Sequence, residues 1–171
     1  VADAPPVLYG QNEIRVNTTT ANDQFYPSIA ALNDGGYVVT WISIDQDGSG
    51  SGIYAQRFGT DGSAAGGETR INTTTASDQH DPSITALSDG GYVVTWSSYG
   101  QDGSGWGIYA QRYDAIGSAV GGETRINTTT ENHQLQPSIT TLNDGGYVVT
   151  CTSDGQDGSG WGIYAQRYDA I

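Results

Sequence analysis

One carboxylate recurs in three identical QDGSG loops and is a candidate ligand for a metal ion. The loops place it at Asp47, Asp102 and Asp157, and two further acidic side chains, Asp45 and Asp154, precede the first and the third loop. Calcium binds about six to eight oxygen atoms from carboxylates, carbonyls and water, so these five residues form the predicted metal site. The alternative is a structural turn, in which each loop aspartate accepts hydrogen bonds from backbone N–H groups. Only one carboxylate is common to all three loops, which favours the turn, and we expect either no cofactor or calcium.

Tryptophan follows the second and the third loop and suggests a different chemistry. Trp106 and Trp161 come directly after these loops, and Ser51 holds that position in the first. An indole ring at a loop exit can stack on the apolar face of a sugar ring, while neighbouring amides and carboxylates supply hydrogen bonds. Repetition of weak, equal sites would add avidity; alternatively, the tryptophans fill gaps between repeats. The predicted carbohydrate-binding residues are Trp106, Trp161, Gln46, Gln101, Gln156, Asp102 and Asp157.

The other nucleophilic and metal-ligating residues form no catalytic pattern. Cys151 stands where Trp41 and Trp96 stand in the earlier repeats, so we expect a small buried residue and not a nucleophile. His80 and His133 are not equivalent to one another, whereas repeated zinc sites would need repeated ligands. Hydrolysis requires one specialised cleft. Because the three repeats are nearly identical, we expect several shallow binding sites and no enzyme.

These residues recur because the chain consists of three copies of one unit. Asn17, Asn72 and Asn127 begin three NTTT runs at a spacing of 55 residues, and the GYVVT runs and QDGSG loops keep this spacing. A period near 50 residues is typical of repeats that bury their apolar surface against their neighbours. The predicted organisation is an N-terminal extension at 1–12 followed by repeats at 13–67, 68–122 and 123–171.

Each repeat predicts four short strands, called A, B, C and D in chain order. NDGG and SDGG turns join B to C as in β-hairpins, and a proline precedes each predicted strand B. The arginines lie on strands A and D, where we expect them to pair with Glu13, Glu68, Glu123 and nearby aspartates. The predicted ranges are 13–18, 68–73 and 123–128 for A; 28–32, 83–87 and 138–142 for B; 37–43, 92–98 and 147–153 for C; and 53–58, 108–113 and 163–168 for D.

Strand C is apolar on both faces, which indicates a sheet that is covered on both sides. In the first repeat Tyr37, Val39 and Trp41 share one face, and Val38 and Thr40 share the other. The blades of a β-propeller are covered in this way by their neighbours. We therefore predict an all-β fold of three four-stranded antiparallel blades with the spatial order B-C-D-A. Propellers have about four to eight blades, so we expect a dimer of six blades in which each chain lends its first strand A to its partner's third blade. The alternative is a β-trefoil or β-prism monomer.

The charge balance limits the choice of partners. The chain has 19 acidic residues against 6 basic ones, with a formal net charge of −13. Such a surface repels nucleic acid and anionic membranes, and no apolar run approaches the roughly 18–20 residues of a membrane span. We expect a glycan or another cell-surface polymer as partner, together with a second copy of the chain, and neither nucleic acid nor membrane insertion. The opening VADAPPVLYG lacks an initiator methionine and an apolar signal core, which predicts a mature protein or an excised piece.

The string PSITALSDGGYVVTW at 82–96, followed by GIYAQRYDA at 107–115, resembles a repeat found in large secreted bacterial surface proteins. There it often accompanies RTX-type calcium-binding segments, cadherin-like domains or adhesin regions. The resemblance covers all three repeats and implies a propeller-like module, secreted or at the bacterial cell surface, without a settled enzymatic role. It leaves two functions open: ligand binding, and a structural, assembly or calcium-stabilised adhesin role without a ligand. No GGxGxDxUx run occurs, so a calcium β-roll is not implied.

Overall fold

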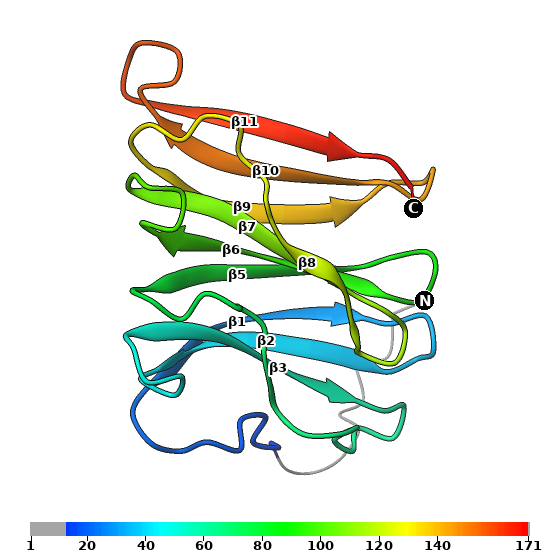
Figure 1. The fold of residues 1–171 in the computed structure, drawn as a ribbon. Coiled ribbons are helices and arrows are strands. Elements are labelled where there is room, and N and C mark those ends of the chain that lie inside the picture. Colours follow the sequence, from blue (N-terminus) through cyan, green and yellow to red (C-terminus); the bar gives the residue numbers. More distant parts are fainter. Residues whose placement is uncertain (1–12, 171) are drawn as a thin grey trace, which may run out of the picture.

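The computed structural model describes residues 13–170, which form β-strands joined by turns and loops (Figure 1). The predicted N-terminal extension at 1–12 lies outside the described residues. Eleven strands build three antiparallel sheets in this part of the chain, one sheet from each repeat. Residues 13–170 contain no helix of the length and apolarity that crossing a membrane requires.

The strands follow one another through each sheet in chain order, as the hairpin turns dictate. The first sheet runs β1 (Gln24–Ala31), β2 (Tyr37–Ile44), β3 (Ser51–Phe58), β4 (Thr69–Arg70). The second runs β5 (Gln79–Ala86), β6 (Tyr92–Tyr99), β7 (Trp106–Tyr113), β8 (Ala119–Arg125). The third runs β9 (Gln134–Thr141), β10 (Tyr147–Asp154), β11 (Trp161–Tyr168). The predicted order B-C-D-A is confirmed in the first two sheets, and the third shows B-C-D.

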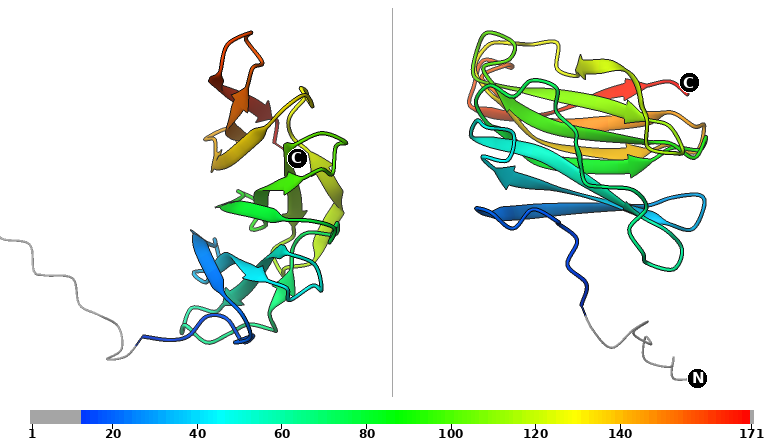
Figure 2. Two further views of the ribbon diagram at one scale, coloured as in Figure 1. Left: turned by 90° about the vertical axis from the view of Figure 1, so that its left-hand side faces the viewer. Right: turned by 60° about the horizontal axis from the view of Figure 1, so that its bottom comes forward.

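The sheets fan out in an arc, with the first strand of each on the inner side (Figure 2). The inner strand β5 contacts β1 on one side and β9 on the other. The second strand of each sheet lies next to its inner strand, and β4 and β8 form the outer rim of the first two sheets. This is the blade arrangement that the repeat predicted.

Strand B differs from its predicted range, because it begins four residues earlier and contains its proline. The pairing of β1 with β2 shifts between Phe25 and Ser28, and Tyr26 has a φ of 53°. The same bulge recurs at Asp81 and Gln136, with φ of 53° and 55°. A bulge leaves one residue out of the hydrogen-bond ladder, so Pro27 is accepted inside the strand. The prediction that the proline precedes the strand was wrong.

Strand A is the least regular element and departs most from its predicted range. Residues 13–18 form no strand, β4 covers two residues, and β8 ends at Arg125 before the predicted end at 128. Beside β3 the ladder continues by other means: the Ile71 N–H donates to the Ile53 carbonyl at 2.8 Å, and the Ile53 N–H donates to Asn72 Oδ1 at 2.8 Å. A side chain therefore replaces the backbone where strand A was expected to continue.

The sheets hold together through apolar faces, and the second sheet is covered on both sides. Neighbouring residues of β6, Val93 and Val94, point to opposite faces and are 1% and 0% exposed. Val94 packs towards the first sheet in a cluster with Ile42 and Ile53, and Val93 lies with Val149 of the third sheet. Burying one such side chain contributes about 1.5–3 kcal/mol, so the repeats stabilise one another.

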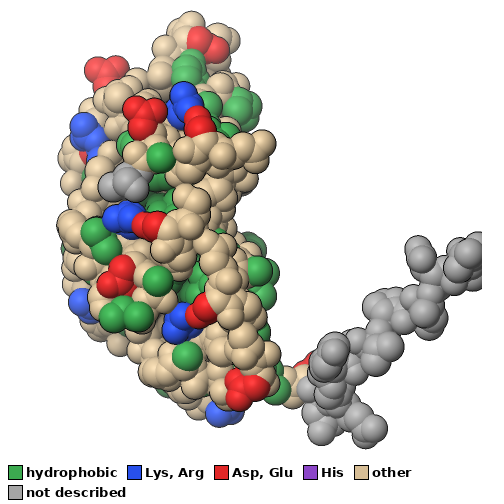
Figure 3. Space-filling model, turned by 90° about the vertical axis from the view of Figure 1, so that its right-hand side faces the viewer, with side chains coloured by type: hydrophobic (Ala, Val, Ile, Leu, Met, Phe, Trp, Pro, Cys, Tyr) green, Lys and Arg blue, Asp and Glu red, His purple; other side chains and the backbone are tan. Residues whose placement is uncertain are grey.

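Ion pairs lie at the end of the sheets where the NDGG and SDGG turns are. Arg57, Arg112 and Arg167 each bind the aspartate of the turn in their own sheet, and Figure 3 shows paired basic and acidic side chains on this side. The expected pairing of the strand A arginines with glutamates is wrong: among residues 13–170 Glu68 and Glu123 accept hydrogen bonds from threonine and glutamine side chains instead.

Cys151 replaces a core tryptophan and leaves space behind. Trp41 and Trp96, its equivalents, are 3% and 0% exposed, whereas Cys151 is half-buried beside a cavity of about 70 Å³. Burial raises the pKa of the Cys151 thiol, which disfavours the thiolate. The expectation that Cys151 is buried is met only in part, because the residue is half-buried.

We predict opposite effects for the reciprocal exchanges at this position. Trp96→Cys should lower the free energy of unfolding by about 3 kcal/mol, as large-to-small core substitutions do. Cys151→Trp should raise it by about 1 kcal/mol, because the indole fills the cavity as in the other two sheets. Urea denaturation at one fixed protein concentration measures both. Equal destabilisation by the two exchanges would contradict the equivalence of the sheets.

Candidate functional site

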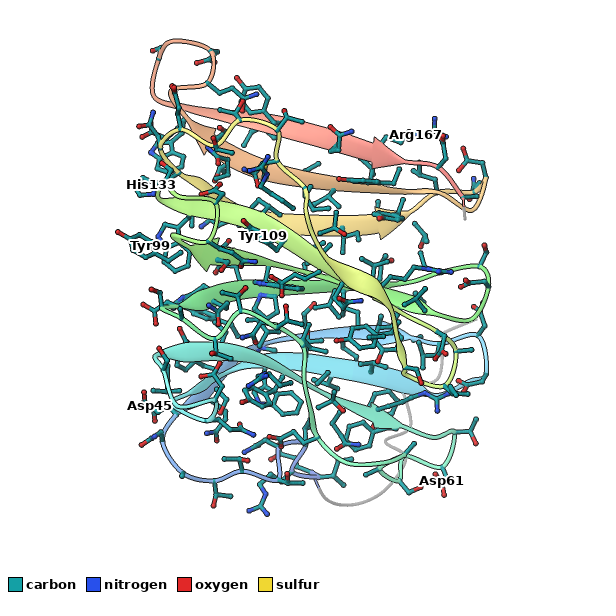
Figure 4. The ribbon with its side chains drawn as sticks, in the orientation of Figure 1. Asp45, Asp61, Tyr99, Tyr109, His133 and Arg167 are labelled. Carbon is teal, nitrogen blue, oxygen red and sulfur yellow. The ribbon has the colours of Figure 1, made fainter. Side chains whose placement is uncertain are left out.

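The candidate residues gather at one end of the sheets, which we call the loop face. It consists of the loops at 45–50, 100–105 and 155–160 and the links at 20–23, 75–78 and 130–133, all on the left in Figure 1. In Figure 4, Asp45, Tyr99 and His133 mark this face, whereas Arg167 lies towards the opposite end. The loops alternate with the links because each strand C ends, and each strand B begins, at this face.

The loop aspartates form turns. Oδ1 of Asp47, Asp102 and Asp157 accepts the N–H of the serine two residues later, at 3.2, 3.2 and 3.1 Å. Asp45 is exposed and Asp154 is half-buried. Among residues 13–170 no three or more histidine, cysteine, aspartate or glutamate side chains come close enough together to hold a metal ion. The geometry favours the Asx turn for the loop aspartates, and calcium remains a prediction.

An asparagine beneath the loop face was missed as a functional residue; it is buried at position 72 and half-buried at position 127. Asn72 is 1% exposed and donates to the Thr74 carbonyl at 2.9 Å and to Gln79 Oε1 at 2.8 Å, while it accepts from Ile53. Asn127 repeats the pattern with Thr129, Gln134 and Ile108. The available signal was the constant seven-residue spacing from this asparagine to a glutamine. The asparagine joins the rim of one sheet to the inner strand of the next.

Two glutamates bind the links from the rim. Glu68 Oε2 accepts the Thr18 N–H at 2.7 Å and the Thr18 hydroxyl at 2.8 Å, and Gln46 donates to Oε1. Glu123 repeats this with Thr73 and Gln101. Gln46 and Gln101, predicted to bind ligand, are therefore engaged by the scaffold, whereas Gln156 is exposed.

The second sheet carries an aromatic cluster that the other sheets lack. The Trp106 ring meets His80 and Tyr99 edge-on, with centroids 5.2 and 5.3 Å apart, and Tyr99 is 46% exposed. The equivalent positions hold Phe25, Ile44 and Ser51 in the first repeat and Leu135, Asp154 and Trp161 in the third. Sequence reasoning identified Trp106 but missed its two neighbours. The expectation of equal sites is wrong for this position, because the cluster breaks the repeat.

His133 connects this cluster to the third sheet. Its Nδ1 accepts a hydrogen bond from the backbone N–H of Trp106 at 3.3 Å, and its ring stacks on that of Trp161 with centroids 6.5 Å apart. The approach requires glycine at 105, where a Cβ atom would lie 2.3 Å from His133 Nδ1. Trp161 is 57% exposed. We call His80, Tyr99, Trp106, His133 and Trp161 the aromatic row.

Comparison with known proteins identifies the fold. No protein-family model and no curated protein matches the sequence. An endo-arabinase from Bacteroides thetaiotaomicron and a thermostable family-43 glycoside hydrolase each match 90% of the chain with a TM-score of 0.58, at 16% and 14% identity. A protein of unknown function from Dyadobacter fermentans matches 85% with a TM-score of 0.61 at 12% identity. The chain spans 59%, 58% and 51% of the lengths of these structures. The endo-arabinase and the family-43 glycoside hydrolase are β-propellers, which supports the propeller interpretation over the β-trefoil and β-prism alternative.

The glutamate contacts predict a loss of stability in acid. Burial raises the pKa of Glu68, but the hydrogen bonds from Gln46 and Thr18 outweigh it and hold the pKa below its ordinary value. The contribution of ionised Glu68 to the free energy of unfolding is therefore complete above the unfolded pKa of about 4.3. It disappears as pH falls through the lower folded pKa. Glu68→Gln should lower the melting temperature at pH 7 and flatten its decline below pH about 4.3. The control Glu131→Gln, at an exposed position, should give the same dependence of melting temperature on pH as the wild type. Identical dependences for wild type and Glu68→Gln would contradict the stabilising role of Glu68.

The turn interpretation predicts indifference to calcium. Removing calcium with a chelator should shift the melting temperature by less than about 1 °C, because a ligand stabilises a protein only through binding to the folded state. Differential scanning calorimetry with calcium and with chelator measures this. A rise of several degrees with calcium, lost in Asp157→Asn, would contradict it.

Proposed function

We infer that the protein binds carbohydrate polymers along the aromatic row. The observation that carries this proposal is the cluster of Trp106, Tyr99 and His80, which is partly exposed although large aromatic rings favour burial. Rings with an apolar face and a polar edge suit sugars, which likewise present C–H faces and hydroxyl edges. The row continues through His133 to Trp161, so it suits a chain of sugar units better than a single one.

The polar neighbours of the row suit the same ligand. Asn132 is exposed beside His133, and the second loop adds the half-buried Asp102. The third loop adds Gln156 and Asp157, both exposed. Amide and carboxylate groups around an aromatic platform can select among sugar hydroxyls. The predicted ligand residues of the second and third loops precede Trp106 and Trp161 in the chain, while Gln46 belongs to a loop that is followed by Ser51.

The fold and the charge agree with this function. The endo-arabinase and the family-43 glycoside hydrolase share the fold and act on carbohydrates. A net charge of −13 keeps the surface from anionic polymers such as nucleic acids but does not oppose a neutral glycan. The resemblance to secreted bacterial surface repeats supports a setting outside the cell, where such polymers occur.

Binding without hydrolysis is part of the proposal. Glycoside hydrolysis commonly uses two carboxyl groups about 5–9.5 Å apart. Near the row, Asp78 accepts the Ser51 N–H and hydroxyl at 3.1 and 2.9 Å, so its carboxylate serves the scaffold. The groove of about 310 Å³ at the inner strands is lined by one carboxylate, Asp81, among its described residues. The inner groove therefore offers no carboxylate pair among its described lining residues.

Binding to a panel of plant, algal and bacterial polysaccharides tests the function. The combined variant Tyr99→Ala and Trp106→Ala should weaken binding of the recognised polysaccharide at least about tenfold, equivalent to about 1.4 kcal/mol. Titration calorimetry or affinity electrophoresis measures the change. Tyr26→Ala is the matched control, because Tyr26 is a 62% exposed aromatic residue on the inner strand β1 and lies outside the row.

Two results would contradict the proposal. One is the absence of binding across the panel by folded protein. The other is a loss of affinity in Tyr26→Ala with none in the row variant, which would move the site to the inner groove.

A further inference from the structure

The third sheet is incomplete among the described residues. β3 pairs with β4 and β7 pairs with β8, but no described strand lies along the outer edge of β11. An unpaired edge exposes backbone N–H and C=O groups that favour the addition of another strand. The left-hand view of Figure 2 shows β11, coloured red, at one end of the arc.

The residues of β11 are exposed where their equivalents are buried. Ile163 is 75% exposed, whereas Ile53 and Ile108 are 0% exposed. Ala165 and Gln166 are exposed as well, although their counterparts in β3 and β7 are buried. Identical local sequence in β7 and β11 gives opposite burial, so the difference lies in the missing cover and not in the strand.

The chain carries the matching strand at its other end. Residues 13–17 read EIRVN, where the rim segments at 68–72 and 123–127 read ETRIN. Val16 packs against a cluster of Val39, Trp41 and Phe58 on the outer face of the first sheet. Its equivalent Ile71 lies in the cluster between the first and the second sheet.

The end of this segment repeats the side-chain contacts of the rim segments. Asn17 donates to the Thr19 carbonyl at 2.6 Å and to Gln24 Oε1 at 3.0 Å, as Asn72 does to Thr74 and Gln79. Asn72 Oδ1 and Asn127 Oδ1 each accept an isoleucine N–H of the strand beside them. Asn17 Oδ1 has no such donor among residues 13–170, and the Ile163 N–H is the equivalent donor.

We propose that a second copy of this chain docks on the third sheet and adds its residues 13–17 antiparallel to β11. Pairing follows the repeat: Tyr54 opposes Arg70 and Tyr109 opposes Arg125, so Tyr164 opposes the partner's Arg15 and Ala165 opposes the partner's Ile14. Because each copy has both the open edge of β11 and a rim segment at 13–17 with no paired strand among the described residues, two copies satisfy each other through a two-fold axis. The product is a closed ring of six sheets.

The apolar faces match in the same arrangement. The outer face of the first sheet carries Trp41, Tyr54 and Phe58 and borders a groove of about 310 Å³. Its equivalents in the second sheet, Trp96, Tyr109 and Tyr113, cover Val38, Ile42 and Ile53 of the first sheet. In the ring, the partner's first sheet covers Val148, Thr152 and Ile163 in this way. Each chain thus buries two sheet faces in the ring: the outer face of its first sheet and the outer face of its third sheet.

The partner also completes the loop face around Trp161, a step that rests on the proposed function. Asp78 accepts the Ser51 N–H, and His133 accepts the Trp106 N–H; the equivalent acceptor for Trp161 is the partner's Asp23. The partner's Glu13 takes the position that Glu68 holds towards Thr18 and Gln46, and so binds Thr128 and Gln156. It enters beside the groove of about 650 Å³ that Thr128 lines. The end of the aromatic row is therefore built from two chains.

Solution mass and a designed cross-link test the assembly. Light scattering of the 171-residue chain should give twice the chain mass of 18.0 kDa, and Ile163→Asp should reduce this to one chain mass. In a Cys151→Ser background, Ile14→Cys combined with Ala165→Cys should form a disulfide-linked dimer in nearly all molecules on oxidation, because directly opposed residues have close Cβ atoms. Ile14→Cys combined with Thr140→Cys is the control and should stay uncross-linked, since Thr140 is on β9.

The outcomes separate the possible assemblies. A monomer without cross-link overturns the proposal even if Ile163→Asp fails to fold, because the cysteine variants report independently. A ladder of larger cross-linked species overturns the closed two-fold ring in favour of an open chain of copies. A dimer that binds no polysaccharide leaves the assembly standing and removes the proposed function. A monomer that still binds polysaccharide through Trp106 removes the proposed assembly and leaves the proposed function standing.

Discussion

The structure depends on one constraint: apolar sheet faces must be covered, and the second sheet, which is apolar on both faces, has a neighbouring sheet on each side. Val93 and Val94 show this most plainly, since consecutive residues of β6 are both buried, one against each adjacent sheet. A sheet of this kind is not stable alone, because one face would expose several large aliphatic and aromatic side chains to water. The constraint explains the stacking into an arc and the constant spacing of the repeats.

Side-chain hydrogen bonds hold the rim segments in place, although these segments contain little regular β-strand. The rim strand must leave its sheet and cross to the inner strand of the next, and a backbone ladder cannot continue through that crossing. Asn72 and Glu68 replace it, the first by joining β3 to Gln79 and the second by holding Thr18 near the rim. Both satisfy backbone groups that would otherwise lack partners at the crossing. These hydrogen bonds hold the crossing in each repeat, while residues of the loop face differ between the repeats. The aromatic row lies on this face.

Much of the fold could be predicted from the sequence, since its signals are local. Alternating residues in GYVVT, the NDGG turns and the 55-residue period indicate strands, hairpins and blades without long-range information. The bulge at Tyr26 and the short β4 could not be predicted, because they depend on a backbone φ and on a side chain 19 residues from Ile53. Trp106 was identified by its place after a loop. His80 and Tyr99 were missed because they reach it from the ends of two other strands.

The need to cover apolar sheet faces applies most clearly at the open edge of β11. Amide hydrogen exchange of the Ile163 N–H tests this most directly, because that group lies on the open edge of β11 while Ile108 N–H, its equivalent in β7, donates to Asn127 at 2.7 Å. If every sheet requires cover on both sides, the Ile163 amide is protected to a similar degree as Ile108 at high protein concentration and loses protection on dilution. Rapid exchange at Ile163 at every concentration, with Ile108 protected, would show that a sheet of this type is stable with one face bare.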